Sequence, residues 1–282
     1  MAQFTNQAQL SYNNSITNSN IAIGEILEVL SATKTALTDS YVRNDNIIYI
    51  ISIINSGTVD INGLTISDNL GNYSFGATTL TPLEYVQGSI RYYINGILQI
   101  APTVTTDPTF IISGINVPAE GNAIVIYETI TNQFAPLDVA SNITNSAIIS
   151  GGNITPITVT ETVETQNAAD LTITKSISPV PVTENGRLTY TFYIQNSGNT
   201  EADTEANIVI TDVFDPILTN ITVTLNGSAF PAISYSYDET TGIFQTEAGS
   251  ITVPAATYTQ DPTDGRIIIN PGLATLVVTG TV

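Results

Sequence analysis

Apolar and polar residues alternate along this chain in short runs, a pattern typical of half-buried β-strands. Thr, Ile, Val, Asn and Tyr fill the runs, and Gly, Pro or Asn-Gly pairs separate them. No segment has the period of a helix. Strands are expected at 47–54, 88–94, 123–129, 188–194, 207–213, 220–225 and 274–282. Asn95-Gly96 and Asn226-Gly227 have the composition of tight hairpin turns. The pattern predicts an all-β protein built from antiparallel sandwiches.

The same pattern occurs twice. The chain has only two lysines, Lys34 and Lys175, which lie 141 residues apart, and each is followed by an Asn-Ser-Gly turn. Other matched pairs are Tyr49 and Tyr190, Asn55 and Asn196, and Asp68 and Asp212. A chain of 282 residues is long enough for two domains. We therefore expect two tandem sandwich domains.

The two repeats end differently. Repeat one continues into an alternating segment at 143–151, whereas repeat two reaches Val282 without a counterpart. A similar segment stands at the start of the chain, where Asn6 matches Asn145. The residues expected to form this donor strand are Phe4, Asn6, Ala8, Leu10 and Tyr12.

A sandwich that lacks its closing strand exposes an open edge. We expect residues 4–13 of one subunit to fill repeat two of the next subunit, as in strand addition. Such head-to-tail contacts produce open filaments when they do not close into a ring. The alternative is that the segment folds back on its own repeat two and gives a monomer.

Repeat two contains three segments that together resemble a known family. They read Leu-Thr-Ile-Thr-Lys-Ser from 171, Leu-Thr-Tyr-Thr-Phe-Tyr-Ile-Gln-Asn-Ser-Gly-Asn-Thr from 188, and Ile-Val-Ile-Thr-Asp-Val-Phe from 208. This resembles the DUF11 repeat of bacterial surface proteins, and repeat one has the same anchors more loosely. The resemblance implies two tandem immunoglobulin-like β-sandwich domains, which we place at 29–160 and 161–282. The comparison of the two repeats places an N-terminal donor strand and linker before them, at 1–28. It also implies an extracellular, wall-associated setting.

Each repeat places a lysine, an aspartate and an asparagine on core-facing sides of predicted strands, because residues two apart share a face. Burial favours a neutral lysine, and a neutral amine is a nucleophile. Immunoglobulin-like domains of Gram-positive surface proteins are known for Lys–Asn isopeptide bonds. The hypothesis assigns Lys34, Asp68 and Asn145 to a bond within one subunit. It assigns Lys175, Asp212 and Asn6 of a neighbour to a bond between subunits.

Three alternatives stay open at this site. The Lys–Asp pairs are ordinary buried ion pairs with no bond. The recurring Asn55 and Asn196 supply the amide instead, although their Asn-Ser-Gly context is more typical of turns. Glu128 is a further acid with core-facing parity, but the repeat places a glycine, Gly280, at its position.

Composition limits the function further. There is no histidine and no cysteine, so the usual general base, thiolate nucleophile and transition-metal ligands are missing, and no enzyme activity, cofactor or metal site is expected. The net charge of −19 argues against nucleic acid and anionic membranes, and favours at most loose binding of divalent cations.

The first residues have neither a basic region nor an apolar run, so no secretory signal peptide is expected. An extracellular, spore or cell-surface location without such a signal is the prediction. We expect a structural filament subunit, pilus-like or part of a spore appendage, whose partner is itself. The alternative is a monomeric cell-surface adhesin.

Overall fold

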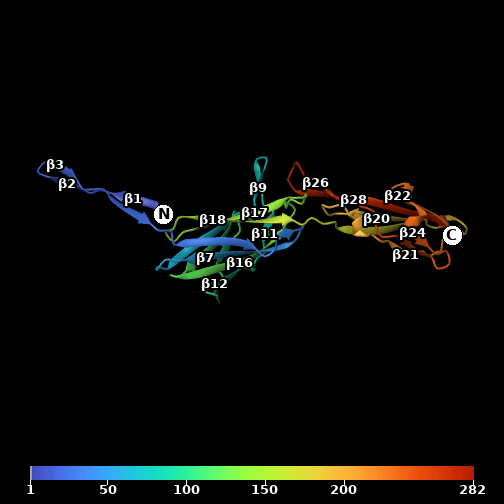
Figure 1. Cartoon of the computed structure of the whole chain (residues 1–282), viewed down its shortest axis with the longest axis horizontal. Coiled ribbons are helices and arrows are strands. Elements are labelled where there is room, and N and C mark those ends of the chain that lie inside the picture. Colours follow the sequence, from blue (N-terminus) through green and yellow to red (C-terminus); the bar gives the residue numbers. More distant parts are fainter. Residues whose placement is uncertain (1) are drawn as a thin grey trace. The chain divides into compact units, whose positions relative to one another are not determined.

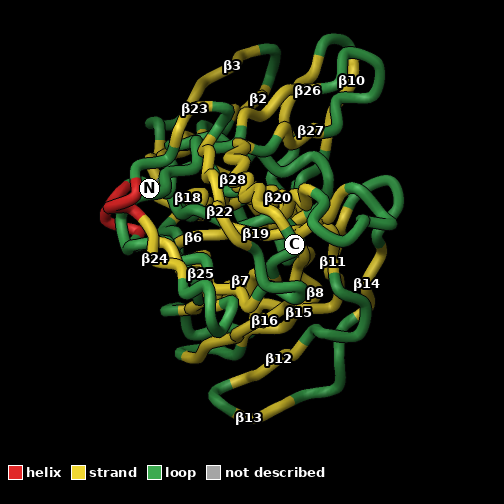
Figure 2. The backbone as a smooth tube through the Cα atoms, turned by 90° about the vertical axis from the view of Figure 1, so that its right-hand side faces the viewer, coloured by secondary structure: helices red, strands yellow, loops and turns green. Residues whose placement is uncertain are grey.

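The computed structural model describes residues 2–282, which form two compact units. Unit 1 comprises residues up to 39, 44–132 and 143–163, and unit 2 comprises 40–43, 133–142 and 164–282. Strands dominate both units (Figure 2). The helices among residues 2–282 are two three-residue turns, η1 (Thr204–Ala206) and η2 (Ala232–Ser234), and neither is long enough to cross a membrane. The all-β prediction is confirmed.

The first sheet of unit 1 contains the strand that carries Lys34, which we call the lysine strand. Its order is β13-β12-β16-β7-β5, and β11 also pairs with β16. The bounds are β5 (Leu30–Ala36), β7 (Asn46–Asn55), β11 (Leu83–Tyr85), β12 (Arg91–Ile94), β13 (Ile97–Leu98) and β16 (Gly121–Thr131). The lysine strand β5 is antiparallel to β7, with Lys34 opposite Ile51.

The second sheet of unit 1 contains the strands that carry Asp68 and Asn145. Its order is β14-β15-β8-β17-β18. The bounds are β8 (Ile61–Asp68), β14 (Thr103–Thr105), β15 (Phe110–Val117), β17 (Asn142–Ser150) and β18 (Ile157–Thr165). Strand β8 lies between β15 and β17 and is therefore paired on both edges. The last residues of β18 pair in parallel with β6 (Ser40–Tyr41), and a small hairpin joins β9 (Tyr73–Phe75) to β10 (Thr78–Leu80).

Alternation explains the core of unit 1. Along β7, every second residue from Ile47 to Ile53 is fully buried, while the residues between them are partly exposed. Leu64 and Ile66 of β8 and Ile112 of β15 supply the facing layer from the second sheet. Burial of each such side chain contributes about 1.5–3 kcal/mol, so the two sheets are held together by a continuous apolar layer.

Unit 2 repeats only part of this plan. Its larger sheet has the order β19-β20-β28-β22-β23, and its smaller sheet is β21-β25-β24. The bounds are β19 (Leu171–Ser178), β20 (Arg187–Asn196), β21 (Thr211–Val213), β22 (Thr219–Leu225), β23 (Ser228–Ala229), β24 (Tyr235–Tyr237), β25 (Ile243–Thr246) and β28 (Gly272–Thr281). A separate hairpin joins β26 (Thr257–Gln260) to β27 (Ile267–Asn270). The unit has its own apolar core, in which Phe214, Phe244 and Leu276 are buried.

The N-terminal segment differs from the expected single strand over residues 4–13. It forms β1 (Ala2–Asn6) and β2 (Gln9–Tyr12), and the chain then turns back as β3 (Ser15–Asn18) and β4 (Ala22–Ile26). Strand β1 pairs with β4 and β2 pairs with β3 (Figure 1). Asn13 and Asn14 have positive φ angles, as a tight hairpin turn requires. We call residues 2–26 the N-terminal ribbon.

Most expected strands exist, with changes at two boundaries. The segment expected at 88–94 begins only at Arg91, and the segment expected at 207–213 is strand only over β21. The second difference arises because Asp203 caps η1 and Asn207 ends it in the left-handed conformation. The two Asn-Gly turns are confirmed: Asn95-Gly96 and Asn226-Gly227 have positive φ at both residues and close the hairpins β12–β13 and β22–β23.

Candidate functional site

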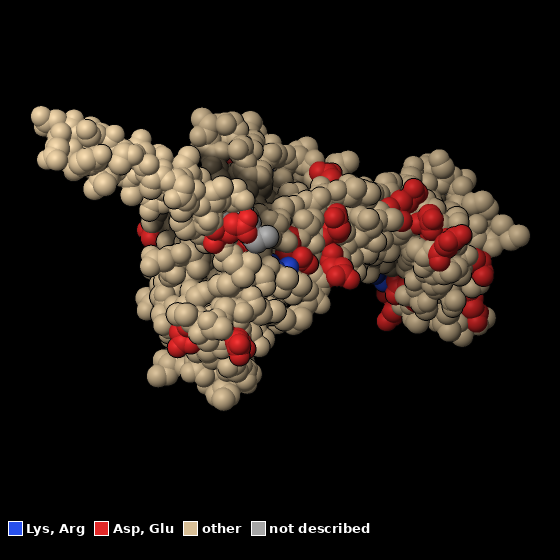
Figure 3. Space-filling model, turned by 60° about the vertical axis from the view of Figure 1, so that its left-hand side comes forward, with Lys and Arg blue, Asp and Glu red and all other residues tan. Residues whose placement is uncertain are grey.

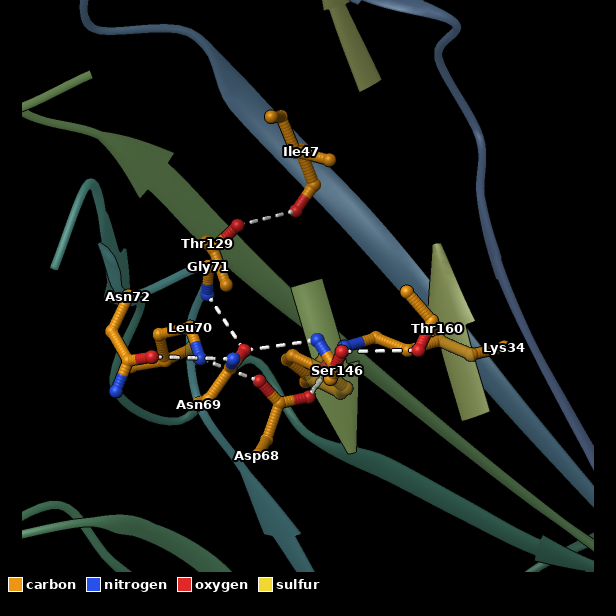
Figure 4. A network of polar contacts seen from close by, with 11 residues as sticks. Lys34, Ile47, Asp68, Asn69, Leu70, Gly71, Asn72, Thr129, Ser146 and Thr160 are labelled. Carbon is orange, nitrogen blue, oxygen red and sulfur yellow. Dashed lines mark hydrogen bonds and ion pairs between the residues drawn. The ribbon is translucent and has the colours of Figure 1, made fainter. Parts of the chain in front are cut away.

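Unit 1 holds a fully buried lysine–aspartate pair. The Nζ atom of Lys34 on β5 lies 2.7 Å from Oδ2 of Asp68 at the end of β8, and both side chains are 0% exposed. The Tyr127 hydroxyl on β16 donates a hydrogen bond to the same carboxylate oxygen. The other oxygen, Oδ1, accepts from the backbone N–H of Leu70 (Figure 4). The carboxylate is therefore held by three donors from three parts of the unit.

Asn145 on β17 completes the buried group. Ala147 lies opposite Asp68 in the ladder between β17 and β8, and Asn145 shares the inward face of β17 with Ala147. Its side chain is 0% exposed, and neither amide atom has a hydrogen-bond partner among the described residues. A buried primary amide without partners is costly, because its donors and acceptor have lost water without replacement. The strand thus presents an unsatisfied carboxamide to the core beside the ion pair.

The surroundings of the pair favour an uncharged amine. Burial lowers the pKa of Lys34, while Asp68 and, more weakly, Glu161 oppose the shift. Burial also raises the pKa of Tyr49 and Tyr127, and the charge of Asp68 adds to the rise, so both phenols keep their protons. The Lys34 ammonium also lies 4.8 Å from the centre of the Tyr49 ring. A proton that moves from Lys34 to Asp68 leaves a nucleophilic amine and a carboxylic acid in one apolar site.

Unit 2 brings the repeated pair together without burying it. Lys175 on β19 forms an ion pair with Asp212 on β21, and the side chains are 38% and 19% exposed. The Lys175 ammonium lies 4.3 Å from the centre of the Tyr190 ring. The backbone register matches unit 1 closely: Leu30 faces Asn55 as Leu171 faces Asn196. The two sites therefore have the same framework and different coverage.

The difference in coverage comes from two missing strands. In unit 1, β17 pairs with β8, and β18 follows β17 in the same sheet. In unit 2, β21 pairs with β25 only, and no residue of 2–282 occupies its other edge. As a result every residue of β19 is exposed, whereas Leu30 and Lys34 of β5 are buried. The apolar side chains left exposed around this edge are Leu171, Ile173, Ile177, Val209 and Val213. We call this surface the open edge of unit 2.

The remaining predicted residues lie elsewhere. Asn6 is exposed on β1 of the N-terminal ribbon, and Phe4, Ala8, Leu10 and Tyr12 are exposed with it. Asn55 and Asn196 are buried and each donates to backbone carbonyls beside its turn, which is the turn role expected from their sequence context. Glu128 was expected to face the core and does not: Tyr127 and Thr129 occupy the buried positions on either side of it. Its counterpart in the ladder of unit 2 is Thr279 and not Gly280 as the repeat alignment suggested.

Sequence reasoning missed Tyr127. Its position in the ladder opposite Tyr49 corresponds to Val278 opposite Tyr190 in unit 2, so the phenol is not repeated. Only its alternation with Val125 and Thr129 indicated an inward side chain. The described residues include no cluster of three or more acidic groups suited to a metal ion. Acidic side chains are scattered over the surface instead (Figure 3).

No family model matches the chain, so membership of the DUF11 family stays an expectation. No curated protein matches it either. Several solved structures are similar at low identity. The pilus backbone RrgB from Streptococcus pneumoniae has 13% identity and a TM-score of 0.35, over 86% of this chain and 55% of RrgB.

Two further solved structures are similar. The major pilin subunit BcpA of Bacillus cereus has 10% identity and a TM-score of 0.36, over 96% of this chain and 73% of BcpA. ACE19, the collagen-binding subdomain of the Enterococcus faecalis surface protein ACE, has 13% identity and a TM-score of 0.32, over 50% of this chain and 99% of ACE19. At such TM-scores these similarities carry no argument about function, which has to come from the residues of this chain.

Proposed function

We propose that the chain is a structural subunit of an extracellular filament, pilus-like or part of a spore appendage. Subunits join head-to-tail when the N-terminal segment of one copy adds to the open edge of unit 2 in the next. Assembly is locked by Lys–Asn isopeptide bonds. The observation that carries the proposal is the contrast between β8, which is paired on both edges, and β21, which has one edge free.

The open edge has what strand addition requires. A free strand edge offers unpaired backbone N–H and C=O groups, and exposed apolar side chains beside it gain by being covered. The N-terminal ribbon offers complementary apolar side chains. Those exposed on it and available for burial include Phe4, Leu10, Tyr12 and Ile26. Both surfaces lose exposed apolar area when they meet, which favours association.

Charge also favours this pairing. The chain has a net charge of −19, so two copies repel each other over most of their surfaces. The first charged side chain of the chain is Glu25, and the ribbon before it is entirely uncharged. A donor whose one charged side chain, Glu25, lies near its end can therefore approach an acidic neighbour with little charge repulsion.

The covalent step is the same in both units. Lys34 passes a proton to Asp68, and the neutral amine attacks the side-chain carbonyl carbon of Asn145. The Asp68 carboxylic acid donates a hydrogen bond to the amide oxygen as the C–N bond forms. The proton lost by the attacking amine leaves with the amide nitrogen as ammonia, so one isopeptide bond replaces one primary amide and no oxidant is needed. Between subunits, Lys175, Asp212 and Asn6 of the neighbour take these roles.

Deletion tests the assembly. We expect the full chain to form filaments by electron microscopy and a chain lacking residues 2–26 to remain dispersed in sedimentation. Filaments of equal length from the deleted chain would contradict strand donation. If the deleted chain failed to fold, residues 2–26 supplied as a peptide should restore it and inhibit assembly of the intact chain.

Mass tests the bonds. Boiled filaments should run as a ladder on a denaturing gel, and each bond should remove about 17 Da as ammonia. Asn6→Ala should abolish the ladder but leave filaments visible, while Asn18→Ala on the same ribbon should change neither. Bands at the unmodified monomer mass would contradict the isopeptide step.

A further inference from the structure

We infer that the donated element is the whole N-terminal ribbon, residues 2–26, which replaces two strands of unit 2 and not one. The inference rests on the proposed strand donation and specifies the donor and the surface it covers. Its starting point is the pair β17 and β18 of unit 1, for which unit 2 has no equivalent among residues 2–282.

In unit 1 both strands are needed to enclose the lysine site. Strand β17 supplies Asn145 and pairs with β8. Strand β18 lies beside it, with hydrogen bonds between the side chains of Thr144 and Thr162 on the outer face. Its inner residues Val159 and Val163 are buried. Glu161 of β18 also accepts a hydrogen bond from the backbone of Ala36 on β5, so β18 closes the site over the lysine strand.

The ribbon aligns with both strands. Residues 4–11 match 143–150, and residues 16–34 match 157–175, with two residues fewer in the connecting turn. Identical residues at matched positions are Thr5 and Thr144, Asn6 and Asn145, Ala8 and Ala147, Ser11 and Ser150, Ile16 and Ile157, Thr17 and Thr158, Leu30 and Leu171, Thr33 and Thr174, and Lys34 and Lys175. The match therefore runs through the second strand of the hairpin and into the lysine strand that follows it.

Pairing in the β1–β4 half of the ribbon keeps the matched faces together, whereas in the β2–β3 half Gln9, which matches exposed Ile148, lies opposite Asn18, which matches buried Val159. Asn6 lies opposite Ala22, and Phe4 lies opposite Gly24 with its ring over the glycine. The matched residues in unit 1 are Asn145 and Val163, which are both buried. On the other face of the ribbon Ile21 matches Thr162, which is exposed. The β1–β4 half of the ribbon thus has one face that matches core positions of unit 1 and one face that matches solvent positions.

Chain order shows which unit the ribbon completes. The hairpin β17–β18 leads into β19, so it completes unit 1 and precedes unit 2. The ribbon leads in the same way into β5, and so it precedes unit 1. By this rule the ribbon completes the unit that precedes it. Within residues 2–282 no unit precedes the ribbon. Unit 2 of a second copy has the vacant edge, and the junction between subunits then repeats the connectivity between units within a subunit.

Two substitutions in the full chain distinguish donation of one strand from donation of two strands. Ala22→Asp places a carboxylate where Val163 is buried in unit 1, and Ile21→Asp places the same charge on the solvent side. We expect Ala22→Asp to reduce filament formation at least tenfold and Ile21→Asp to leave it near the level of the unsubstituted chain. Equal assembly by both variants would overturn the two-strand inference and leave single-strand donation intact.

Transfer of the donor in cis provides a second measurement. In one variant residues 2–26 are moved from the N-terminus to a flexible linker after Val282, and in another only residues 2–13 are moved. The readout is the labelling of Lys175 by an amine-reactive reagent. We expect the 2–26 variant to stay monomeric and to label Lys175 at least tenfold more slowly than the 2–13 variant.

The outcomes are distinguishable. Equal protection of Lys175 by the two transferred segments contradicts the two-strand inference but supports donation. If neither segment protects Lys175, and Ala22→Asp assembles normally, donation itself is wrong and another segment or partner covers the open edge.

Discussion

The two units of this chain contain the same lysine–aspartate pair in opposite environments. Lys34 and Asp68 are 0% exposed, whereas Lys175 and Asp212 are 38% and 19% exposed. The strands that carry the two lysines have the same register against their neighbours. What differs is the hairpin β17–β18, which covers unit 1 and has no counterpart in unit 2. Two strands therefore convert a partly solvated ion pair into an enclosed one.

If the proposed bonds form, the difference in exposure between the two pairs makes the reaction in unit 2 depend on assembly. An ion pair in contact with water is stabilised in its charged form, and its amine is a poor nucleophile. Enclosure removes that solvation and lowers the pKa of the lysine, as at Lys34. On the proposed mechanism, Lys175 becomes reactive only once a neighbour covers it, which prevents wasteful reaction of free subunits.

The largest expected difference between the units is in the stability that is lost when the aspartate is removed from each ion pair. In an Asn145→Ala background that cannot form the bond, Asp68→Ala leaves Lys34 buried without a counter-charge and should lower the free energy of unfolding by about 3–5 kcal/mol. Asp212→Ala in dissociated subunits should cost only about 0.2–1 kcal/mol, because solvent screens Lys175. Chemical denaturation of dissociated subunits measures both. Equal losses would show that the pair in unit 2 is as enclosed as the pair in unit 1.

A smaller effect is expected from removing the hydroxyl of Tyr127, which has no counterpart in unit 2. Tyr127→Phe removes the hydrogen bond to the Asp68 carboxylate and should cost about 1.5–3 kcal/mol, the usual range for a bond to a charged group. Tyr193→Phe, on an exposed side chain of unit 2, serves as the control and should be close to neutral. Denaturation midpoints at constant slope report the change, and an unaltered midpoint in Tyr127→Phe would remove this phenol from the site.

The smallest effect is a rise of stability with pH that comes from Lys34 of unit 1, best measured in an Asn145→Ala background that cannot form the bond. The lowered pKa of Lys34 means that the unfolded chain binds the extra proton below pH 10.5, so stability should rise with pH in that window. The raised pKa values of Tyr49 and Tyr127 act oppositely above their ordinary value of 10.0, where the unfolded phenols ionise first and stability falls. Adding Lys34→Met should remove the rise and keep the fall. A rise that survives Lys34→Met would assign the pH dependence to another group.

Sequence periodicity was sufficient for part of this picture and not for the rest. The pairing of Lys34 with Asp68 follows from alternation, because each residue shares a face with buried neighbours on its own strand. The return of the chain at Asn13 and Asn14 was missed, since regular alternation over 4–13 concealed a two-Asn turn that only left-handed φ angles reveal. Tyr127 was missed because the repeat replaces it with Val278, and a search guided by repeats discards residues present once.

The donor contact itself can be trapped directly, because the chain has no cysteine of its own. In unit 1 Ile148 lies opposite Ser67, and the matched residues for a donated ribbon are Gln9 and Thr211. Facing residues on neighbouring strands lie within disulfide range. The variant Gln9→Cys with Thr211→Cys is oxidised in a mixture of isotopically light and heavy subunits, beside a control with Val213→Cys in place of Thr211→Cys.

The central claim predicts a disulfide ladder in the first variant, with linked peptides that combine a light and a heavy chain, and much weaker linking in the out-of-register control. Linked peptides drawn only from one chain would instead show that the ribbon folds back on its own unit 2. No linkage in either variant would show that the N-terminal ribbon does not reach the open edge of unit 2.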